Sequence, residues 1–273
     1  MIIYGRNPVR EALRGRRARS VAQVWTLAGV AHEPWLIGVQ PKVCGAEELE
    51  RLCGSAAHQG VCAEAGGYPY VGAHELLALD DPLIVALDQV QDPQNLGSIC
   101  RTAECAGATG VIIAERRAAE VTPAACKASA GAVEHMRIAR VRNIADFLGE
   151  ARKAGCWSYG ASAPPDSAAA EGSLGGGARA GDQELGGGAR AGDQKRADAR
   201  PTVPYTAPDY RGGVVLVLGS EGHGLRPRVA GACDQLVSLP LRGRMESLGV
   251  AAAASALMYG ILQGREVGLD KTP

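Results

Sequence analysis

An apolar strand that opens into a glycine-rich loop constrains this fold more than any other stretch of the sequence. Val214–Leu218 is an unbroken apolar run, typical of a strand buried on both faces, and it leads into the hexapeptide GSEGHG, whose carboxylate is Glu221. A second apolar run, 236–241, ends in Arg-Gly-Arg, and Ser247 then stands where the N-cap of an Ala-rich helix belongs. Two such strands predict an α/β domain with a ligand site at the carboxyl edge of its sheet, although two tight turns without a ligand would fit the same spacing.

Length, charge and cysteine usage limit the function classes. The chain has 273 residues, enough for two domains, and its 29 basic and 29 acidic residues cancel, so any nucleic-acid surface must be local. It has no secretory signal and no apolar run near 18 residues, so we expect a soluble, cytoplasmic protein without a membrane partner. The eight cysteines form no C-x-x-C pair and no cluster with zinc spacing, so we expect no metal and reduced, mostly buried thiols.

Residues 1–76 are expected to form a first domain, a small α/β unit with a turn at 5–8, a short helix, a strand at 21–27 and a helix at 47–53. His58, in the loop before its last strand, has no obvious partner residue and is expected to be structural. Six arginines lie within fourteen residues of the first helix and its exit, namely Arg6, Arg10 and Arg14 at helical spacing, followed by Arg16, Arg17 and Arg19. This cluster is the best candidate for RNA phosphate contact, and the alternative is an ordinary solvated helix face.

A linker at 68–81 is expected to lead into a second domain, residues 80–273. Its first strand, 83–87, runs into an amide-rich loop, and Asn95 is a plausible N-cap for a helix that stops at Gly107. A further strand follows, which completes a βαβ unit.

Residues 163–204 are set apart by a tandem repeat, LGGGARAGDQE followed by LGGGARAGDQK. A segment so poor in apolar residues cannot bury enough surface to offset its ordering entropy. We therefore expect a disordered surface insertion in the second domain.

Three ordered segments of the second domain resemble the motifs of one enzyme family. LDQVQDPQNLGSICRTAECAGATGVII resembles the first motif of the SpoU (TrmH-type) ribose 2′-O-methyltransferases of the SPOUT superfamily, and LVLGSEGHGL and SLPLRGRMESLGV resemble the second and third. SAGAVEHMRIARVRN is similar to the part of the fold that bridges them. GRNPVREAL and HQGVCAE resemble the ribosomal-protein-like RNA-binding domain of the branch that methylates a guanosine of 23S rRNA.

The resemblance implies an α/β trefoil-knot domain with a mostly parallel sheet, joined to a small N-terminal α/β RNA-binding domain. It implies S-adenosylmethionine as the cofactor, RNA as the partner and a homodimer whose sites borrow residues across the interface. Gly219 would approach the cofactor with its backbone, and Leu239 and Leu248 would offer main-chain groups and apolar contact. Such roles suit glycine, which allows close approach, and strand ends, which present unpaired backbone groups.

The resemblance also assigns Arg101 the central catalytic role, with Asn95, Glu221 and Ser247 around it. Because an arginine side chain has a pKa above about 12, we interpret Arg101 first as a clamp on phosphate or on developing alkoxide, and only second as a proton acceptor. The local alternative is a surface pair between Arg101 and Glu104, three residues later on the same helix.

One position departs from the family pattern. The third motif of the family reads S-L-N-V-S, whereas residues 247–251 here read SLGVA, so Gly249 replaces the asparagine. We expect Gly249 in the first turn of the helix, where its backbone cost is modest. The lost amide is expected to weaken the positioning of the cofactor or of Arg101.

Three other functions remain open. The same chemistry could act on tRNA, or on an rRNA adenosine to confer antibiotic resistance. Gly249 also leaves room for a non-catalytic RNA-binding assembly factor, which would not bind S-adenosylmethionine. A nicotinamide dehydrogenase is disfavoured, because GSEGHG is not G-x-G-x-x-G and no acidic residue follows at the required distance.

Overall fold

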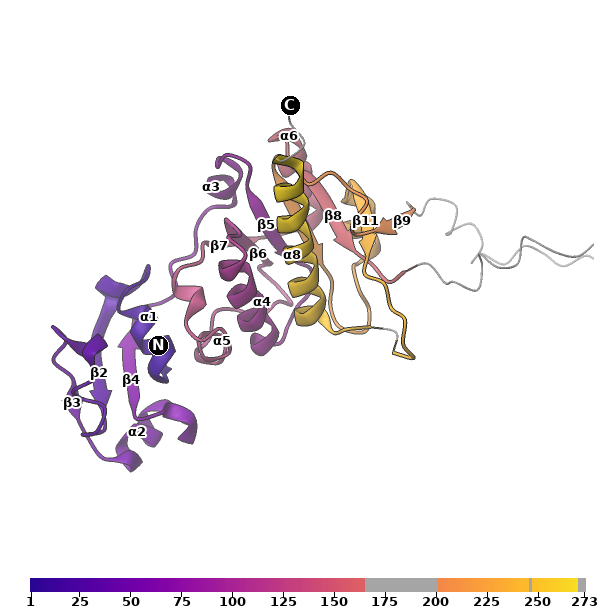
Figure 1. Ribbon diagram of the computed structural model, residues 1–273. Helices are drawn as coiled ribbons and strands as arrows, with labels where there is room; N and C mark the ends of the chain where they lie inside the picture. The colour runs from indigo at the N-terminus through magenta and orange to yellow at the C-terminus, as the bar shows by residue number, and fades with distance from the viewer. Residues whose placement is uncertain (165–200, 246, 270–273) are drawn as a thin grey trace, which may run out of the picture.

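The fold consists of a small N-terminal unit and a larger α/β unit (Figure 1). The structure, a computed structural model, describes residues 1–164, 201–245 and 247–269. The expected disorder of the tandem repeat concerns residues 165–200, which lie outside the described residues.

The N-terminal unit contains a four-stranded sheet with the order β1-β4-β2-β3. Its elements are β1 (Ile2–Tyr4), α1 (Arg6–Ala12), η1 (Ala18–Ser20), β2 (Val21–Thr26), η2 (Pro34–Leu36), β3 (Lys42–Val43), α2 (Ala46–Cys53), η3 (Ala56–His58) and β4 (Val61–Ala65). Strand β4 is antiparallel to β1 and β2, while β3 is parallel to β2. The expected turn at 5–8 is wrong in its extent, because Gly5 alone makes the turn with a φ of 98° and α1 begins at Arg6. Pro8 fits the first turn, where a missing N–H costs little.

The second unit contains a seven-stranded sheet with the order β7-β6-β5-β10-β8-β11-β9. Its strands are β5 (Leu83–Leu87), β6 (Gly110–Ala114), β7 (Ile138–Val141), β8 (Trp157–Ala161), β9 (Thr202–Pro204), β10 (Val214–Leu218) and β11 (Gln235–Ser238). Its helices are α3 (Ala73–Leu77), α4 (Pro93–Cys105), α5 (Pro123–Ala128), η4 (Ala132–Glu134), α6 (Ile144–Lys153), α7 (Pro227–Ala232) and α8 (Val250–Leu269). All the strand pairs that the structure describes in this sheet are parallel, which confirms the expected α/β class.

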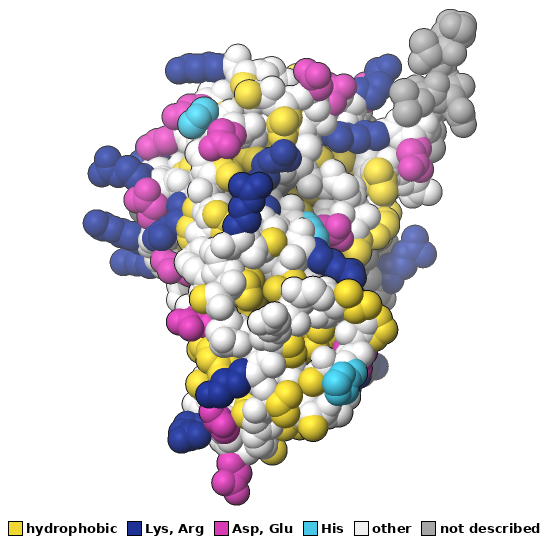
Figure 2. All heavy atoms as spheres, turned by 90° about the vertical axis from the view of Figure 1, so that its left-hand side faces the viewer, with side chains coloured by type: hydrophobic (Ala, Val, Ile, Leu, Met, Phe, Trp, Pro, Cys, Tyr) yellow, Lys and Arg dark blue, Asp and Glu magenta, His cyan; other side chains and the backbone are white. Residues whose placement is uncertain are grey.

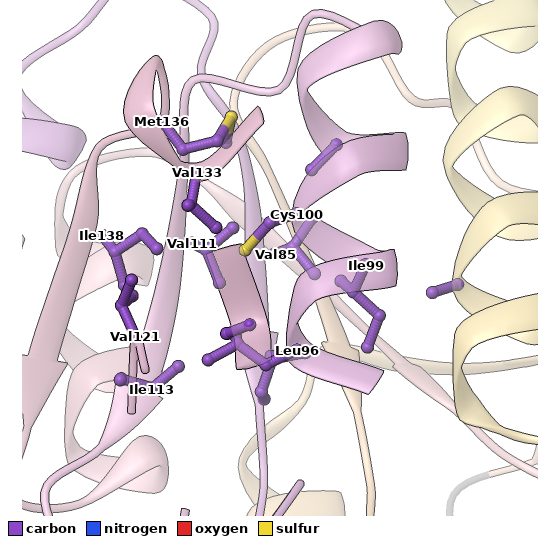
Figure 3. Packing of buried hydrophobic residues seen from close by; sticks show 14 of the residues in the cluster. Val85, Leu96, Ile99, Cys100, Val111, Ile113, Val121, Val133, Met136 and Ile138 are labelled. Carbon is purple, nitrogen blue, oxygen red and sulfur yellow. The ribbon is translucent and has the colours of Figure 1, made fainter. Parts of the chain in front are cut away.

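The central strands are apolar throughout because both faces of the sheet are covered. Every residue of β5, β6 and β10 is buried. Since neighbouring side chains in a strand point to opposite faces, Val85 packs toward α4 while Ile84 packs toward α6. Figure 3 shows Val85, Val111 and Ile113 of the sheet beside Leu96, Ile99 and Cys100 of α4.

Two of three predicted boundaries differ from the structure. Asn95 is not an N-cap, because the Asp92 carboxylate accepts from the N–H of Gln94 (2.9 Å) and Pro93 starts α4. Gly107 ends this helix with a φ of +69°, as expected. The insertion is shorter than 163–204, since Thr202–Pro204 forms β9 and pairs with β11.

The segment expected to be a plain linker, 68–81, contains structure of its own. Tyr68 is buried, Val71 bridges to Ala139, and α3 lies within it. Leu76 of α3 packs into the core cluster beside β5, so the end of the interval expected for the first domain belongs to the core of the second.

Candidate active site

The carboxyl ends of β5 and β10 lie side by side where the strand order reverses. Leu87 and Leu218 are register partners, and the N–H of Asp88 donates to the carbonyl of Leu218 (2.7 Å). On one side of this pair, β6 and β7 follow β5 in the sheet. On the other side, β8, β11 and β9 follow β10. Such a switch point is where open parallel sheets bind ligands.

The loop after β10 is a tight hairpin that depends on glycine. Ser220 and Gly224 exchange two backbone hydrogen bonds of 3.1 and 3.0 Å. Gly222 and Gly224 have φ values of +80° and +63°, which favour glycine. Gly219 needs glycine for a different reason: a Cβ there would lie 2.1 Å from the carbonyl carbon of Gly224.

A cavity of about 650 Å³ lies under this hairpin, within the usual range for small-molecule sites. Residues from the hairpin, the end of β11 and the start of α8 line it. They include five predicted site residues, Gly219, Glu221, Leu239, Ser247 and Leu248. The structure therefore brings together residues from two motifs that are separated in the sequence.

A second cavity of about 500 Å³ lies on the other side of Glu221, between the hairpin and the loop after β5. Asn95 lines this cavity, and its side-chain amide donates to Glu221 Oε1 over 3.0 Å. Ser220, Glu221, His223 and Val250 line both cavities, so the two cavities adjoin at these residues.

Two predictions about the start of the last helix are wrong. Ser247 is not its N-cap and Gly249 is not in its first turn, because α8 begins at Val250. Gly249 precedes the helix with a φ of +74°, and its carbonyl accepts from the N–H of Ala253 (3.0 Å). A Cβ at Gly249 would lie 4.0 Å from Glu221 Oε1, so a longer polar side chain would reach the Glu221 carboxylate.

Arg101 is not brought to the cavities of its own chain. It lies on α4 six residues after Asn95, which is roughly 9 Å further along the helix. Its side chain is exposed and makes no hydrogen bond or ion pair with any residue that the structure describes, so the alternative surface pair with Glu104 is not formed.

The arginine cluster of the N-terminal unit is less available than its spacing predicts. Arg6 pairs with Glu33 (3.2 Å), Arg10 pairs with Glu11 (2.7 Å), and Arg17 is buried. Figure 2 shows basic and acidic side chains intermixed on the face that includes this unit. Arg14, Arg16 and Arg19, which follow α1, remain exposed.

Other exposed arginines, missed in the sequence, lie at the carboxyl edge of the larger sheet. Arg116 and Arg117 follow β6, and Arg142 follows β7. Within the described part of the chain, none of the three makes an ion pair. Their signal in the sequence is that each follows an apolar strand within three residues.

Asp88 is a further residue that the sequence reading missed. It is fully buried directly after β5, and its carboxylate accepts from Arg226 through the backbone N–H (3.0 Å) and Nε (2.8 Å). Arg226 ends the hairpin region and caps α7, so the Asp88–Arg226 pair ties the two loops that line the cavities. An acid directly after a buried strand was the available signal.

The remaining sequence predictions concern cysteines, His58, metals and membranes. Five of the eight cysteines, namely Cys62, Cys100, Cys126, Cys156 and Cys233, are buried. His58 is buried and accepts from the N–H of Gly60 (3.0 Å), which confirms a structural role. Within residues 1–164, 201–245 and 247–269, no group of three potential metal ligands occurs, and no helix is long and apolar enough to cross a membrane.

Known proteins match this chain over both units. The SpoU rRNA Methylase family matches residues 82–174 and 189–259, and the family of RNA 2′-O ribose methyltransferase substrate-binding domains matches residues 2–71. The 23S rRNA (guanosine-2′-O-)-methyltransferase RlmB of Acinetobacter baylyi is 32% identical over 90% of this chain and 85% of its own length.

Two solved structures with bound AdoMet share the fold. The SpoU methyltransferase AviRb from Streptomyces viridochromogenes has a TM-score of 0.70 at 22% identity, covering 96% of this chain and 89% of its own. An rRNA methyltransferase from Sinorhizobium meliloti has a TM-score of 0.70 at 23% identity, covering 96% and 86%. With its two family matches and its glycine hairpin at the switch point of a parallel sheet, the chain belongs to the SpoU rRNA methylase family and is an RNA 2′-O-ribose methyltransferase.

Proposed function

We propose that this enzyme transfers a methyl group from S-adenosylmethionine to the ribose 2′-hydroxyl of a guanosine in 23S rRNA. It does so in the cytoplasm, where its ribosomal RNA substrate is found. The observation that carries the proposal is the pair of adjoining cavities that are both lined by Glu221. A methyl donor in one cavity and a ribose in the other would meet beside Glu221. The relation to RlmB, whose name states this reaction, supports the choice of a 23S guanosine.

The residues of the larger cavity fit S-adenosylmethionine. Leu239, Leu248 and Leu257 offer apolar surface for an adenine ring, and the glycine hairpin presents backbone groups to a polar ligand. Gly219 lets the hairpin close tightly beside this cavity, because a Cβ there would clash with the backbone of Gly224. When bound, the cofactor supplies a methyl group activated as a sulfonium.

The smaller cavity fits the target nucleoside. The Asn95 amide donates a hydrogen bond to Glu221, which orients the carboxylate where the two cavities adjoin. A carboxylate there would accept a hydrogen bond from the 2′-hydroxyl and align its oxygen with the methyl group. Gln89 and Gln91 line the same cavity and can bond to a base edge.

We propose a homodimer because Arg101 lies outside the site of its own chain. An exposed apolar strip on α8, formed by Ala252, Ala256 and Tyr259, lies on a helix that packs against α4. Pairing two such faces would cover the strip and bring Arg101 of the partner subunit to the cavity, where its charge could stabilise the developing alkoxide. The unpaired Arg116, Arg117 and Arg142 would hold RNA phosphates along the edge of the sheet.

The test is methyl transfer from radiolabelled S-adenosylmethionine to rRNA isolated from a strain that lacks the gene, followed by mapping of 2′-O-methyl positions. Incorporation at one 23S guanosine is expected. Labelling of tRNA or of an rRNA adenosine instead would refute the substrate. If calorimetry detects no S-adenosylmethionine binding, the proposed methyltransferase activity is refuted. A non-catalytic RNA-binding assembly factor would then be the remaining function.

Replacing Gly249 with asparagine should raise kcat/KM by about three- to tenfold. The position has a φ of +74°, which asparagine tolerates better than other side chains, and the added amide would reach Glu221. A hydrogen bond to a charged group contributes about 1.5 kcal/mol, which sets this range. Gly249→Ala is the control, since it adds a Cβ at the same positive φ without the amide. An unchanged rate in Gly249→Asn would mean that the position is dispensable.

Replacing Asp88 with asparagine should weaken S-adenosylmethionine binding about tenfold. The neutral amide loses its charge-assisted bonds to Arg226, and the hairpin becomes less firmly held over the cavity. Isothermal titration calorimetry measures the affinity. Asp146→Asn, which removes the exposed pair with Arg228, is the control and should change nothing. Equal affinities in wild type and Asp88→Asn would contradict a role for this pair in holding the loops.

A further inference from the structure

A buried ion pair joins the two units of the chain. Arg17 lies between α1 and η1 of the N-terminal unit, and Glu134 lies in η4 of the larger unit. Arg17 is 2% exposed and Glu134 is fully buried. Arg17 Nε donates to Glu134 Oε2 over 2.8 Å, and Nη2 donates to Oε1, so the guanidinium and carboxylate meet in a two-pronged pair.

The surroundings of the pair come from both units. Arg17 Nη1 donates to the carbonyl of Gly66 (3.3 Å), and Nη2 donates to Cys126 Sγ (3.3 Å). Burial and the nearby Glu134 charge raise the pKa of Cys126 to about 11, so its thiol is neutral. Burial lowers the pKa of Arg17, but its bonds to Glu134 outweigh that and raise it overall. Glu134 is therefore the buried carboxylate that balances this charge.

Backbone contacts fit the same docking arrangement. The N–H of Arg16 donates to the carbonyl of Glu134 over 2.8 Å. A Cβ on Gly15 would lie only 2.4 Å from that carbonyl oxygen, although Gly15 has no positive φ, so space alone requires glycine there. The Tyr68 hydroxyl, at the junction, donates to the carbonyl of Met136 (2.6 Å). Figure 1 shows α1 beside α5, and one core cluster runs through both units.

The Arg17–Glu134 pair bears on how the two units are held relative to each other. Domains joined by a linker move relative to each other by default, unless their interface is large and apolar. An apolar interface would stabilise docking as well as a buried ion pair does, because the charges must first be desolvated. The ion pair restricts the orientation of the two units relative to each other, because both hydrogen bonds form only at one orientation.

We propose that the Arg17–Glu134 pair is a positioning lock that holds the N-terminal RNA-binding unit at one distance and angle from the methyl-transfer cavity. RNA bound to both units must then match that fixed spacing, so the lock determines which ribose reaches the cavity. This inference rests on the proposed function for its consequence in RNA, but not for the lock itself.

The lock is tested first without RNA. Spin labels are placed on the full-length protein through noncanonical amino acids at Val43 and Trp157, which are 53% and 58% exposed and lie in different units. Pulsed electron paramagnetic resonance should give one narrow distribution of distances between the two labels in the wild type. It should give a broad distribution in Gly15→Ala and in the double variant Arg17→Leu/Glu134→Leu, whose apolar pair keeps the interface packed. Gly67→Ala, where a Cβ meets nothing within 4 Å, should stay narrow.

The same variants are then assayed for methyl transfer. A broken lock should raise KM for 23S rRNA on the order of tenfold or more, leave S-adenosylmethionine affinity unchanged and add methylation at other nucleotides. Narrow distances and wild-type KM in both Gly15→Ala and the double variant would overturn the proposal. If wild type methylates no RNA, the proposed function fails, while the distance measurement still decides the lock.

Discussion

Replacing Arg101 with alanine should lower kcat at least about 100-fold while the affinity for S-adenosylmethionine stays within a few-fold. The exposed guanidinium makes no hydrogen bond or ion pair with a described residue of its own chain, so its removal should leave the fold intact. Loss of a group that stabilises developing charge costs roughly two to three powers of ten in rate. Single-turnover methylation of rRNA measures the rate, and calorimetry measures the affinity.

Two controls separate charge from geometry. Arg101→Lys keeps the charge but loses the planar fork, so intermediate activity would indicate a clamp and near-normal activity a simple point charge. Arg51→Ala removes an exposed arginine from α2. Because α2 belongs to the N-terminal unit and lines neither cavity, this change should leave kcat unchanged. An Arg101→Ala enzyme with near-normal turnover would contradict any catalytic role.

The location of Arg101 also predicts that it acts on the partner subunit. Mixing Arg101→Ala with a variant that cannot bind cofactor should restore about a quarter of wild-type activity, because half the dimers are mixed and each has one complete site. If Arg101 served its own chain, the mixture would remain inactive. Size-exclusion chromatography with light scattering establishes that dimers form.

The fold could largely be predicted from the sequence because its signals are local. Val214–Leu218 is apolar at five successive positions, and only a strand covered on both faces requires that. The glycine hairpin after it was also predictable, since φ values above zero restrict the residue type. The resemblance to the family then implied that Asn95 and Glu221 belong to one site, and they meet although they are 126 residues apart.

What could not be predicted depends on distant partners. Arg17 follows the spacing of a basic surface, yet it is buried by Glu134, a residue 117 positions away. Ser247 is a good N-cap by type, but the helix starts at Val250, because Gly249 turns the chain with a positive φ. The position of Asp88 directly after a buried strand was a signal in the sequence, but its partner Arg226, 138 residues away, could not be predicted.

Replacing Gly219 with alanine should abolish measurable S-adenosylmethionine binding, with a rise in Kd of at least about 100-fold. The new Cβ would lie 2.1 Å from the carbonyl carbon of Gly224, 2.2 Å from its oxygen and 2.3 Å from the nitrogen of Leu225. All three are backbone atoms, so no side chain can rotate away and the hairpin itself must move. Such a shift weakens cofactor binding, because the hairpin carries several of the groups that line the cofactor cavity.

Gly231→Ala is the matched control for this substitution. It adds the same methyl group on α7, where nothing lies within 4 Å, so cofactor affinity should be unchanged and the melting temperature equal or slightly higher. Because the N-terminal unit is untouched, Gly219→Ala should still bind rRNA in a filter-binding assay. Cofactor binding within threefold of wild type in Gly219→Ala would show that the hairpin yields at little cost and does not shape the cofactor site.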